Sequence, residues 1–333
     1  MQPLSIALLS ALTPAEWERT FFDDRLEPID YEKPTDLVAI SIETFTACRG
    51  YEIAREYRKR KVPVIIGGYH ATFCPDEVLK NADAVCVGEA EGIWQDILDD
   101  ALAKRLSGKY IAPRTSNLIE IHPDRSVFDG RNYFKIALVE TGRGCHFKCS
   151  FCSITAFHQA TYRRKSVDFI VDEIKEIKEK VIFFVDDNIV GDNQNLEALF
   201  KALVPLKIKW VSQASLNLTK NEELLDLMVK SGCEGLLVGF ESLNRENLKR
   251  VGKSVNLACD YEQAIKILRR HGIPVYGTFM FGLDGDSTTV IADTVKFARK
   301  QKLFMAAFNH VVPFPGTPLY EELLEQNRLI DNP

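Results

Sequence analysis

Short runs of apolar residues alternate with longer amphipathic stretches along the first third of the chain. The runs at residues 36–42, 62–68 and 84–88 are rich in valine, isoleucine and other apolar side chains, and glycine or polar residues bound them. Runs of this length and composition are typical of strands buried on both faces of a sheet. The alternation predicts an α/β fold with a Rossmann-like parallel sheet over residues 1–107.

The same alternation repeats six times from about residue 134 onwards. Six βα units predict an open, partial TIM-type barrel over residues 134–333, with the chemistry at the C-terminal ends of its strands. Turn-forming residues dominate 108–133, and we expect a linker there. The predicted strands are 135–141, 181–187, 208–214, 234–241, 274–281 and 303–309, and the predicted helices include 166–179, 193–204, 220–231, 258–271, 286–301 and 317–326.

Three cysteines follow the first predicted strand of the barrel with CxxxCxxC spacing: Cys145, Cys149 and Cys152. A short loop with three thiolates suits an iron–sulfur cube and leaves the fourth iron without a protein ligand. A structural zinc site would need a fourth ligand, and no CxxC or HxxxH partner lies nearby. The spacing also fits one buried helix face, but Gly142 and Gly144 just before it favour a loop.

This stretch, with Phe151 directly before the last cysteine, resembles the radical S-adenosylmethionine (SAM) superfamily. The resemblance implies a [4Fe-4S] cluster on Cys145, Cys149 and Cys152, which are both the metal ligands and the catalytic residues. It also implies that the open iron chelates SAM, and that an electron from the cluster splits the sulfonium to give a 5′-deoxyadenosyl radical. Phe151 would lie at the SAM site. The cofactors supply the difficult chemistry and the protein orients them.

The N-terminal half resembles the cobalamin-binding domain that precedes many radical SAM enzymes, in the stretches Gly67–Thr72 and Val87–Glu91. The resemblance places Gly67, Gly68 and His70 among the cofactor-binding residues, at the carboxyl end of a strand. A DxHxxG segment, which would supply a lower ligand to cobalt, is absent from the sequence. The domain also starts late, with a helix at residues 3–9, so either the sheet lacks an edge or the corrinoid pocket is incomplete.

Polar residues close three of the predicted barrel strands. By resemblance, the strand that ends in Asp186 and Asp187 binds the amino group of SAM, and only one of the two can face the barrel interior. Alternation makes Gln213 and Ser215 an inward-facing pair. Glu241 is assigned by resemblance to the ribose hydroxyls. The alternatives are a solvated turn or helix cap for the aspartates and a structural salt bridge for Glu241.

The composition places limits on partners and compartment. The chain has 333 residues, 46% of them hydrophobic, and a net charge of −5, which does not favour nucleic acid as a substrate. The basic run at 163–165 fits a solvated edge or an anion contact. No transmembrane span or signal peptide is evident, so we expect a cytoplasmic protein. The other five cysteines are scattered and fit core or incidental thiols.

The leading hypothesis is a cobalamin-dependent radical SAM enzyme that methylates an unactivated carbon of a small-molecule substrate. It would take electrons from an external donor such as flavodoxin or ferredoxin. One alternative is cobalamin-independent radical SAM chemistry (rearrangement, oxidation or aminocarboxypropyl transfer) with a vestigial front domain. Another is an iron–sulfur sensor or electron carrier, although such a protein would normally ligate all four irons. Relatives usually continue beyond the last predicted helix, which suggests a short homologue or a truncated chain.

Overall fold

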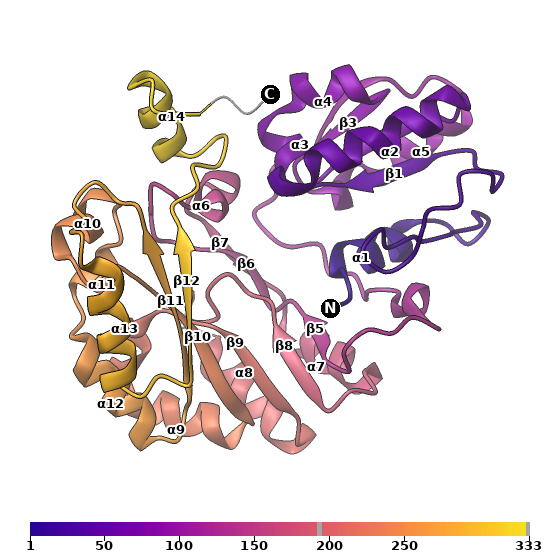
Figure 1. Ribbon diagram of the computed structural model, residues 1–333. Helices are drawn as coiled ribbons and strands as arrows, with labels where there is room; N and C mark the ends of the chain where they lie inside the picture. The colour runs from indigo at the N-terminus through magenta and orange to yellow at the C-terminus, as the bar shows by residue number, and fades with distance from the viewer. Residues whose placement is uncertain (192–194, 331–333) are drawn as a thin grey trace. The chain divides into compact units, whose positions relative to one another are not determined.

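The structure is a computed structural model that describes residues 1–191 and 195–330 (Figure 1). It divides into two compact units, one of residues 2–133 and one that begins at Phe134. Each unit contains its own parallel sheet and its own buried apolar side chains. The α/β fold class predicted from the sequence is therefore correct for both units.

The N-terminal unit is built on a four-stranded parallel sheet in the order β1-β2-β3-β4. Alternation along β2 sends Val64 and Ile66 to one face, where they pack with α2, and Ile65 to the other face, where it packs with Trp94 of α5. Helices on both faces explain why the central strands read as continuous apolar runs. The strands are β1 Val38–Ser41, β2 Val64–Gly67, β3 Ala84–Val87 and β4 Gly108–Ile111.

Strand β4 lies at the start of residues 108–133, where the sequence predicted a linker. Gly108–Ile111 pairs in parallel with β3, and its residues alternate between half-buried and exposed. The apolar pattern did not reveal this strand because an edge strand needs only one apolar face. Of the four residues of β4, only Tyr110 packs against the apolar cluster that contains Trp94.

The helices of this unit follow the predicted alternation, and the first lies where the sequence placed it. They are α1 Leu4–Leu12, α2 Ala47–Lys59, α3 Tyr69–Phe73, α4 Pro75–Asn81 and α5 Trp94–Leu102, with 3₁₀ turns η1 Thr44–Thr46, η2 Ala90–Gly92 and η3 Arg125–Phe128.

The second unit is a six-stranded parallel sheet in the order β5-β8-β9-β10-β11-β12, which confirms the partial barrel. Consecutive strands are neighbours, and in the described part of the chain β5 and β12 do not pair, so the barrel is open. The six strands match the predicted ones: β5 Ala137–Val139, β8 Val181–Phe184, β9 Lys209–Gln213, β10 Cys233–Glu241, β11 Val275–Phe281 and β12 Met305–His310.

The core of this unit lies between the sheet and the helices that cover it. Trp210 of β9 stacks on Phe200 of α8 with ring centroids 5.2 Å apart and meets Phe184 edge-on. The first two residues of the helix predicted at 193–204 lie outside the described residues. The helices are α7 Val167–Glu176, α8 Leu196–Leu203, α9 Glu222–Lys230, α10 Arg245–Arg250, α11 Ser254–Leu257, α12 Tyr261–Arg270, α13 Val290–Lys300 and α14 Pro318–Glu325, with 3₁₀ turns η4 Val204–Leu206 and η5 Leu216–Lys220.

A small antiparallel hairpin, which the sequence did not predict, frames the cysteine segment. Strand β6 (Gly142–Gly144) pairs with β7 (Tyr162–Arg164), and the short helix α6 (Ser153–His158) lies between them in the chain. Three-residue strands with two glycines have no alternating apolar pattern, so the hydrophobic pattern could not reveal them.

Candidate active site

The three cysteines lie in a loop between β6 and α6, at the carboxyl end of the barrel's first strand. Residues 145–152 contain no helix, so the loop prediction is correct and the helix-face alternative is wrong. Hydrogen bonds tie the loop to neighbouring elements, among them those from Ser150 N to Val251 O, from Leu319 N to Ser150 O and from Thr155 Oγ1 to Phe147 O, each 2.9 Å long.

Gly144 is required where the chain enters this loop. Its φ is +93°, and a Cβ there would lie 2.1 Å from the backbone oxygen of Thr161. The strands β6 and β7 therefore approach so closely that only glycine fits. The glycines before the first cysteine thus shape the hairpin that presents Cys145.

The three sulfurs of the loop do not converge as the ligands of a single zinc ion would. Sulfurs around one tetrahedral zinc ion, with bonds of about 2.3 Å, would lie roughly 3.8 Å apart. In the described part of the chain, the three cysteines are not among the groups whose ligand atoms all lie within 4.8 Å of one another. Three thiolates from one short loop are the kind of donor that an iron–sulfur cluster uses.

Burial keeps two of these thiols protonated until a metal replaces the proton. It raises the pKa of Cys149 to about 11, and it also raises the pKa of Cys145. The positive charge of Lys253 lowers the pKa of both thiols and so partly offsets the effect of burial. Cluster assembly therefore releases protons from this loop.

Asp186 is fully buried two residues after β8, the strand that the sequence assigned to the amino group of SAM. The carboxylate has no exposed surface, and it accepts hydrogen bonds from the backbone nitrogen of Thr141 at 2.7 Å and from the Thr141 hydroxyl. Both oxygens thus accept hydrogen bonds from Thr141, which follows β5, so Asp186 positions the segment before the cysteine loop. Burial is the main cause that raises its pKa.

Asp187 holds the loop from the same strand end. Its Oδ2 accepts a hydrogen bond from the backbone nitrogen of Gly144 at 2.9 Å, one residue before Cys145. Burial raises the pKa of this carboxyl to about 7. The two neighbouring aspartates therefore fix two different points of the segment that leads into the cysteines.

Asn188 and Ser215 form a polar pair beside Cys145. The Asn188 amide donates to the Ser215 hydroxyl at 3.1 Å and lies 4.0 Å from the Cys145 sulfur. Gln213, the other predicted inward residue, is half-buried, and its backbone oxygen accepts from Ile189 N at 2.9 Å. Amide and hydroxyl groups therefore lie next to the first cysteine, where they can bind a polar ligand.

Glu241 and Lys253 form an ion pair next to the cysteines, with Nζ and Oε1 2.8 Å apart. The Lys253 ammonium also lies 6.0 Å from the centre of the Phe151 ring. Burial lowers the pKa of Lys253, but Glu241 and Cys149 outweigh it and the net pKa is raised. Lys253 is a site residue that the sequence did not reveal, and its partner is the Glu241 predicted to bind ribose.

The basic run at 163–165 is not a solvated edge. Arg164 donates to the backbone oxygen of Ile189 at 2.8 Å and to the Thr141 hydroxyl at 3.3 Å. Lys165 is buried, 3.6 Å from a Glu140 oxygen. Residues of this run therefore form hydrogen bonds and an ion pair with the segments next to the cysteine loop.

In the N-terminal unit, Gly67 and Gly68 end β2 at the predicted edge. Gly68 has φ +103°, and a Cβ there would lie 2.3 Å from the backbone oxygen of Ile42, so tight packing requires this glycine. At Gly67 a Cβ would make only ordinary contact, 3.4 Å from Cys86 Cβ. Phe45, which follows the edge strand β1, is 73% exposed, and Ile111, the last residue of the edge strand β4, is 66% exposed. An edge with exposed apolar side chains fits a large flat ligand such as a corrinoid.

His70 is turned into this unit. Its ring is buried, with Nδ1 3.4 Å from Thr44 Oγ1 and Nε2 3.2 Å from the Tyr51 hydroxyl. Both ring nitrogens therefore face protein groups, which does not support its predicted role in cofactor binding.

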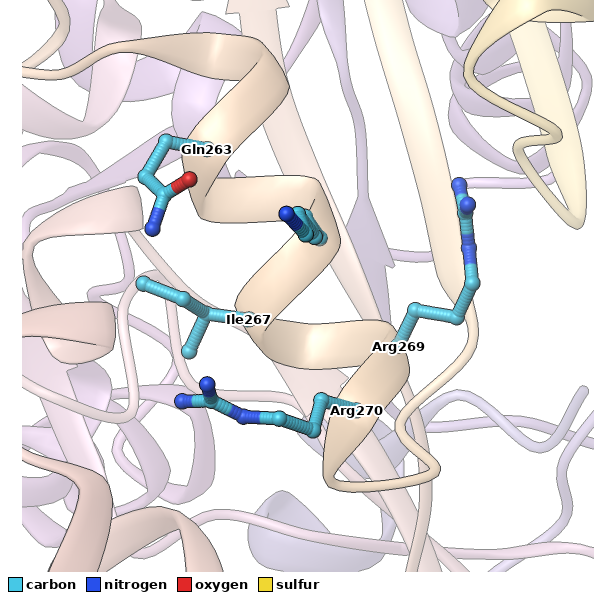
Figure 2. Close-up of a pocket in the computed structure, with 5 residues that line it drawn as sticks. Gln263, Ile267, Arg269 and Arg270 are labelled. Carbon is cyan, nitrogen blue, oxygen red and sulfur yellow. The ribbon is translucent and has the colours of Figure 1, made fainter.

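A separate hollow of about 440 Å³ lies on the outer helix α12, lined by Gln263, Lys266, Ile267, Arg269 and Arg270 (Figure 2). It shares no residue with the predicted site. No helix among the described residues has the length and apolar character to cross a membrane.

Comparison with known proteins agrees with this arrangement. The Radical SAM superfamily matches residues 139–298, and the B12 binding domain matches residues 10–98. A bacteriochlorophyllide d C-8(2)-methyltransferase of Chlorobaculum tepidum is 31% identical over 97% of this chain and 76% of its own length. The chain belongs to the radical SAM superfamily, in the branch with a cobalamin-binding domain. A bacteriochlorophyllide d C-12(1)-methyltransferase of the same organism is 29% identical over 99% of this chain and 75% of its own length.

Solved structures show the same fold. The radical SAM methyltransferase TsrM of Kitasatospora setae superimposes with a TM-score of 0.72 at 17% identity, covering 89% of this chain and 66% of that one. The cobalamin-dependent enzyme OxsB gives a TM-score of 0.67 at 18% identity, covering 90% of this chain and 53% of that one. The chain thus spans about two thirds of the first structure and about half of the second.

The two matched domains imply a [4Fe-4S] cluster, SAM and cobalamin as cofactors. In the radical SAM unit, Cys145, Cys149 and Cys152 would hold the cluster. Residues near the sulfurs, among them Asn188 and Lys253, could meet the polar groups of SAM.

Proposed function

We propose that this chain is a cobalamin-dependent radical SAM methyltransferase that methylates an unactivated carbon of a small organic substrate. The observation that carries the proposal is one chain that joins a three-cysteine loop at the mouth of a partial barrel to a parallel-sheet unit of the B12-binding family. Such a pairing supplies a methyl carrier and a radical initiator to one reaction.

When bound, the cluster and SAM supply a carbon-centred radical, and cobalamin supplies the methyl group. The chain's own groups hold and orient these cofactors. Asp187 and Thr141 fix the entry to the cysteine loop, and the Glu241–Lys253 pair places one charge of each sign beside it. The Lys253 ammonium is suited to the carboxylate of SAM, and the Glu241 carboxylate to hydroxyl donors such as those of ribose.

The substrate class that we propose to test first is a tetrapyrrole. Support comes from the two relatives described above, which are named as bacteriochlorophyllide methyltransferases and align over nearly the whole chain. The electron that starts each turnover would come from an external flavodoxin or ferredoxin. Cobalamin-independent radical SAM chemistry is the competing outcome.

The test is anaerobic turnover of the reconstituted protein with SAM, a low-potential reductant, hydroxocobalamin and bacteriochlorophyllide d. Mass spectrometry should detect 5′-deoxyadenosine together with a substrate product heavier by one CH₂ unit, and both should depend on added cobalamin. Formation of 5′-deoxyadenosine without any requirement for cobalamin would refute the methyltransferase proposal and support the alternative. A Cys152→Ala variant should form neither product.

A further inference from the structure

A second set of metal-ligand side chains lies in the N-terminal unit, away from the cysteine loop in sequence. His70, Cys74 and Glu77 each offer one ligand atom, and the three atoms lie within 4.8 Å of one another. We infer that these residues form a zinc site. The inference is independent of the proposed methyltransferase activity.

The local structure explains why these three side chains converge. His70 lies on α3, Cys74 stands at the junction of α3 and α4, and Glu77 lies on the first turn of α4. Cys74 follows His70 by four residues and Glu77 follows Cys74 by three, in an H-x₃-C-x₂-E pattern. These separations place all three on one side of a nearly continuous helical segment. A spacing of three residues between two ligands on a helix is common in zinc sites.

The distance between the histidine and glutamate ligand atoms matches what zinc requires. His70 Nε2 and Glu77 Oε1 are 3.4 Å apart. Two ligands at about 2.0 Å from a tetrahedral ion would lie roughly 3.3 Å apart. One imidazole nitrogen, one thiolate and one carboxylate form a mixed donor set that suits zinc better than magnesium or calcium, which prefer oxygen ligands alone.

Neighbouring hydroxyl groups complete the surroundings. The Tyr51 hydroxyl of α2 lies 2.8 Å from Glu77 Oε1 and 3.2 Å from His70 Nε2, so it or a water can take the fourth position. Thr44 Oγ1 lies 3.4 Å from the other ring nitrogen of His70. Metal-bound histidines commonly donate this second N–H to an outer partner, which fixes the ring orientation.

Cys74 makes a metal a better explanation than a plain hydrogen-bond network. The Cys74 sulfur lies within 4.8 Å of the ligand atoms of His70 and Glu77, and the hydrogen bonds that join His70, Tyr51 and Glu77 do not involve it. On binding Zn²⁺ the thiol would release its proton to solvent and become the thiolate ligand. The bound ion would join α3 to α4, and the Tyr51 hydroxyl would link α2 to the same site.

The experiment uses the full chain without an affinity tag, with its iron–sulfur cluster reconstituted so that Cys145, Cys149 and Cys152 are occupied. The protein is dialysed against Zn²⁺ and then against buffer, and zinc is measured by plasma mass spectrometry and zinc K-edge absorption. We expect one zinc per chain, with one sulfur at about 2.3 Å and two or three nitrogen or oxygen neighbours at about 2.0 Å. A zinc surrounded by three sulfurs, or no retained zinc, would overturn the inference.

Variants separate the site from incidental binding. Cys74→Ser and His70→Gln should each weaken zinc binding by at least about 10- to 100-fold, the loss seen when even an outer partner of a metal ligand is removed. Cys259→Ser is the matched control, because Cys259 is also a half-buried free cysteine but lies in the barrel unit, and it should bind zinc normally. Zinc should raise the thermal midpoint of wild type and Cys259→Ser but not of Cys74→Ser. Equal retention in Cys74→Ser and wild type would refute the site.

Discussion

Lys253 and Glu241 form an ion pair of 2.8 Å beside the cysteine loop, with side chains that are 17% and 13% exposed. The pair joins the end of β10 to the segment after α10, twelve residues further along the chain. Because both groups are largely removed from water, removing one side chain would leave the other charge buried and unpaired.

Replacing Lys253 should therefore destabilise the protein. Lys253→Met leaves the Glu241 carboxylate without its cation in a mostly buried site, and we expect a loss of about 3 kcal/mol in the free energy of unfolding. Urea unfolding of the cluster-free protein measures it. The matched control is Lys249→Met, which removes an exposed pair with Glu246 and should change stability by less than about 0.5 kcal/mol. Equal effects of the two substitutions would show that the Lys253 pair has no special role.

Gly144→Ala should prevent the cysteine loop from holding its cluster. The added Cβ would meet the backbone oxygen of Thr161, which can move only if the β6–β7 hairpin opens. Iron and sulfide content after anaerobic reconstitution is the readout, and we expect a loss of most of the bound iron. Gly272→Ala is the control, since Gly272 also has a positive φ (+75°) but nothing within 4 Å of its Cβ position. That variant should lose only about 1 kcal/mol and keep its iron.

Asp187→Asn should remove a pH dependence of stability. Burial raises the pKa of this carboxyl from 3.8 to about 7, so the folded state binds a proton that the unfolded state has already released in this range. Stability from this group is therefore greatest below pH 3.8 and is lost as the pH rises to about 7.

The measurement is the unfolding free energy of cluster-free wild type and variant between pH 5 and pH 8. Relative to Asp187→Asn, the wild type should lose about 2 kcal/mol over this range and then level off. The amide oxygen that the substitution introduces can still accept from Gly144 N, so the loop contact is retained. Parallel pH profiles for the two proteins would contradict the assignment.

Thr141→Val should expose the dependence of Asp186 on its partner. The substitution removes the hydroxyl that donates to Asp186 Oδ2 but keeps the backbone donor to Oδ1, so Oδ2 of this fully buried carboxylate keeps only the longer hydrogen bond from the Tyr162 hydroxyl at 3.3 Å. We expect a loss of about 1–3 kcal/mol in unfolding free energy. Thr294→Val is a suitable comparison because that buried hydroxyl bonds only the Val290 carbonyl of its own helix, and its loss should cost clearly less.

Most strands of the two parallel sheets could be predicted because a strand that is buried on both faces is a continuous run of apolar residues. The apolar runs that became β2 and β8, for example, lie within a few residues of their predicted bounds. The edge strand β4 and the hairpin strands β6 and β7 escaped prediction because they are short and carry glycine or charged residues. Their pairing depends on neighbours that the local sequence does not show.

The candidate site was predictable where one residue type is needed at a fixed spacing. The three cysteines and the glycines before them met that condition. The sequence pointed to Asp186 and Asp187 as polar residues that follow a buried strand, but it did not reveal that Thr141 and Gly144 would be their partners. Lys253 was missed because its function depends on a contact with Glu241 that only the folded chain creates.

The most direct test of the central claim is anaerobic reconstitution with iron, sulfide and hydroxocobalamin, followed by desalting, metal analysis and an optical spectrum. A cobalamin-dependent radical SAM enzyme should retain about one corrinoid and one four-iron cluster per chain, and SAM should perturb the cluster spectrum. A four-iron cluster with no corrinoid retained at saturating cobalamin would contradict the claim and leave cobalamin-independent radical chemistry.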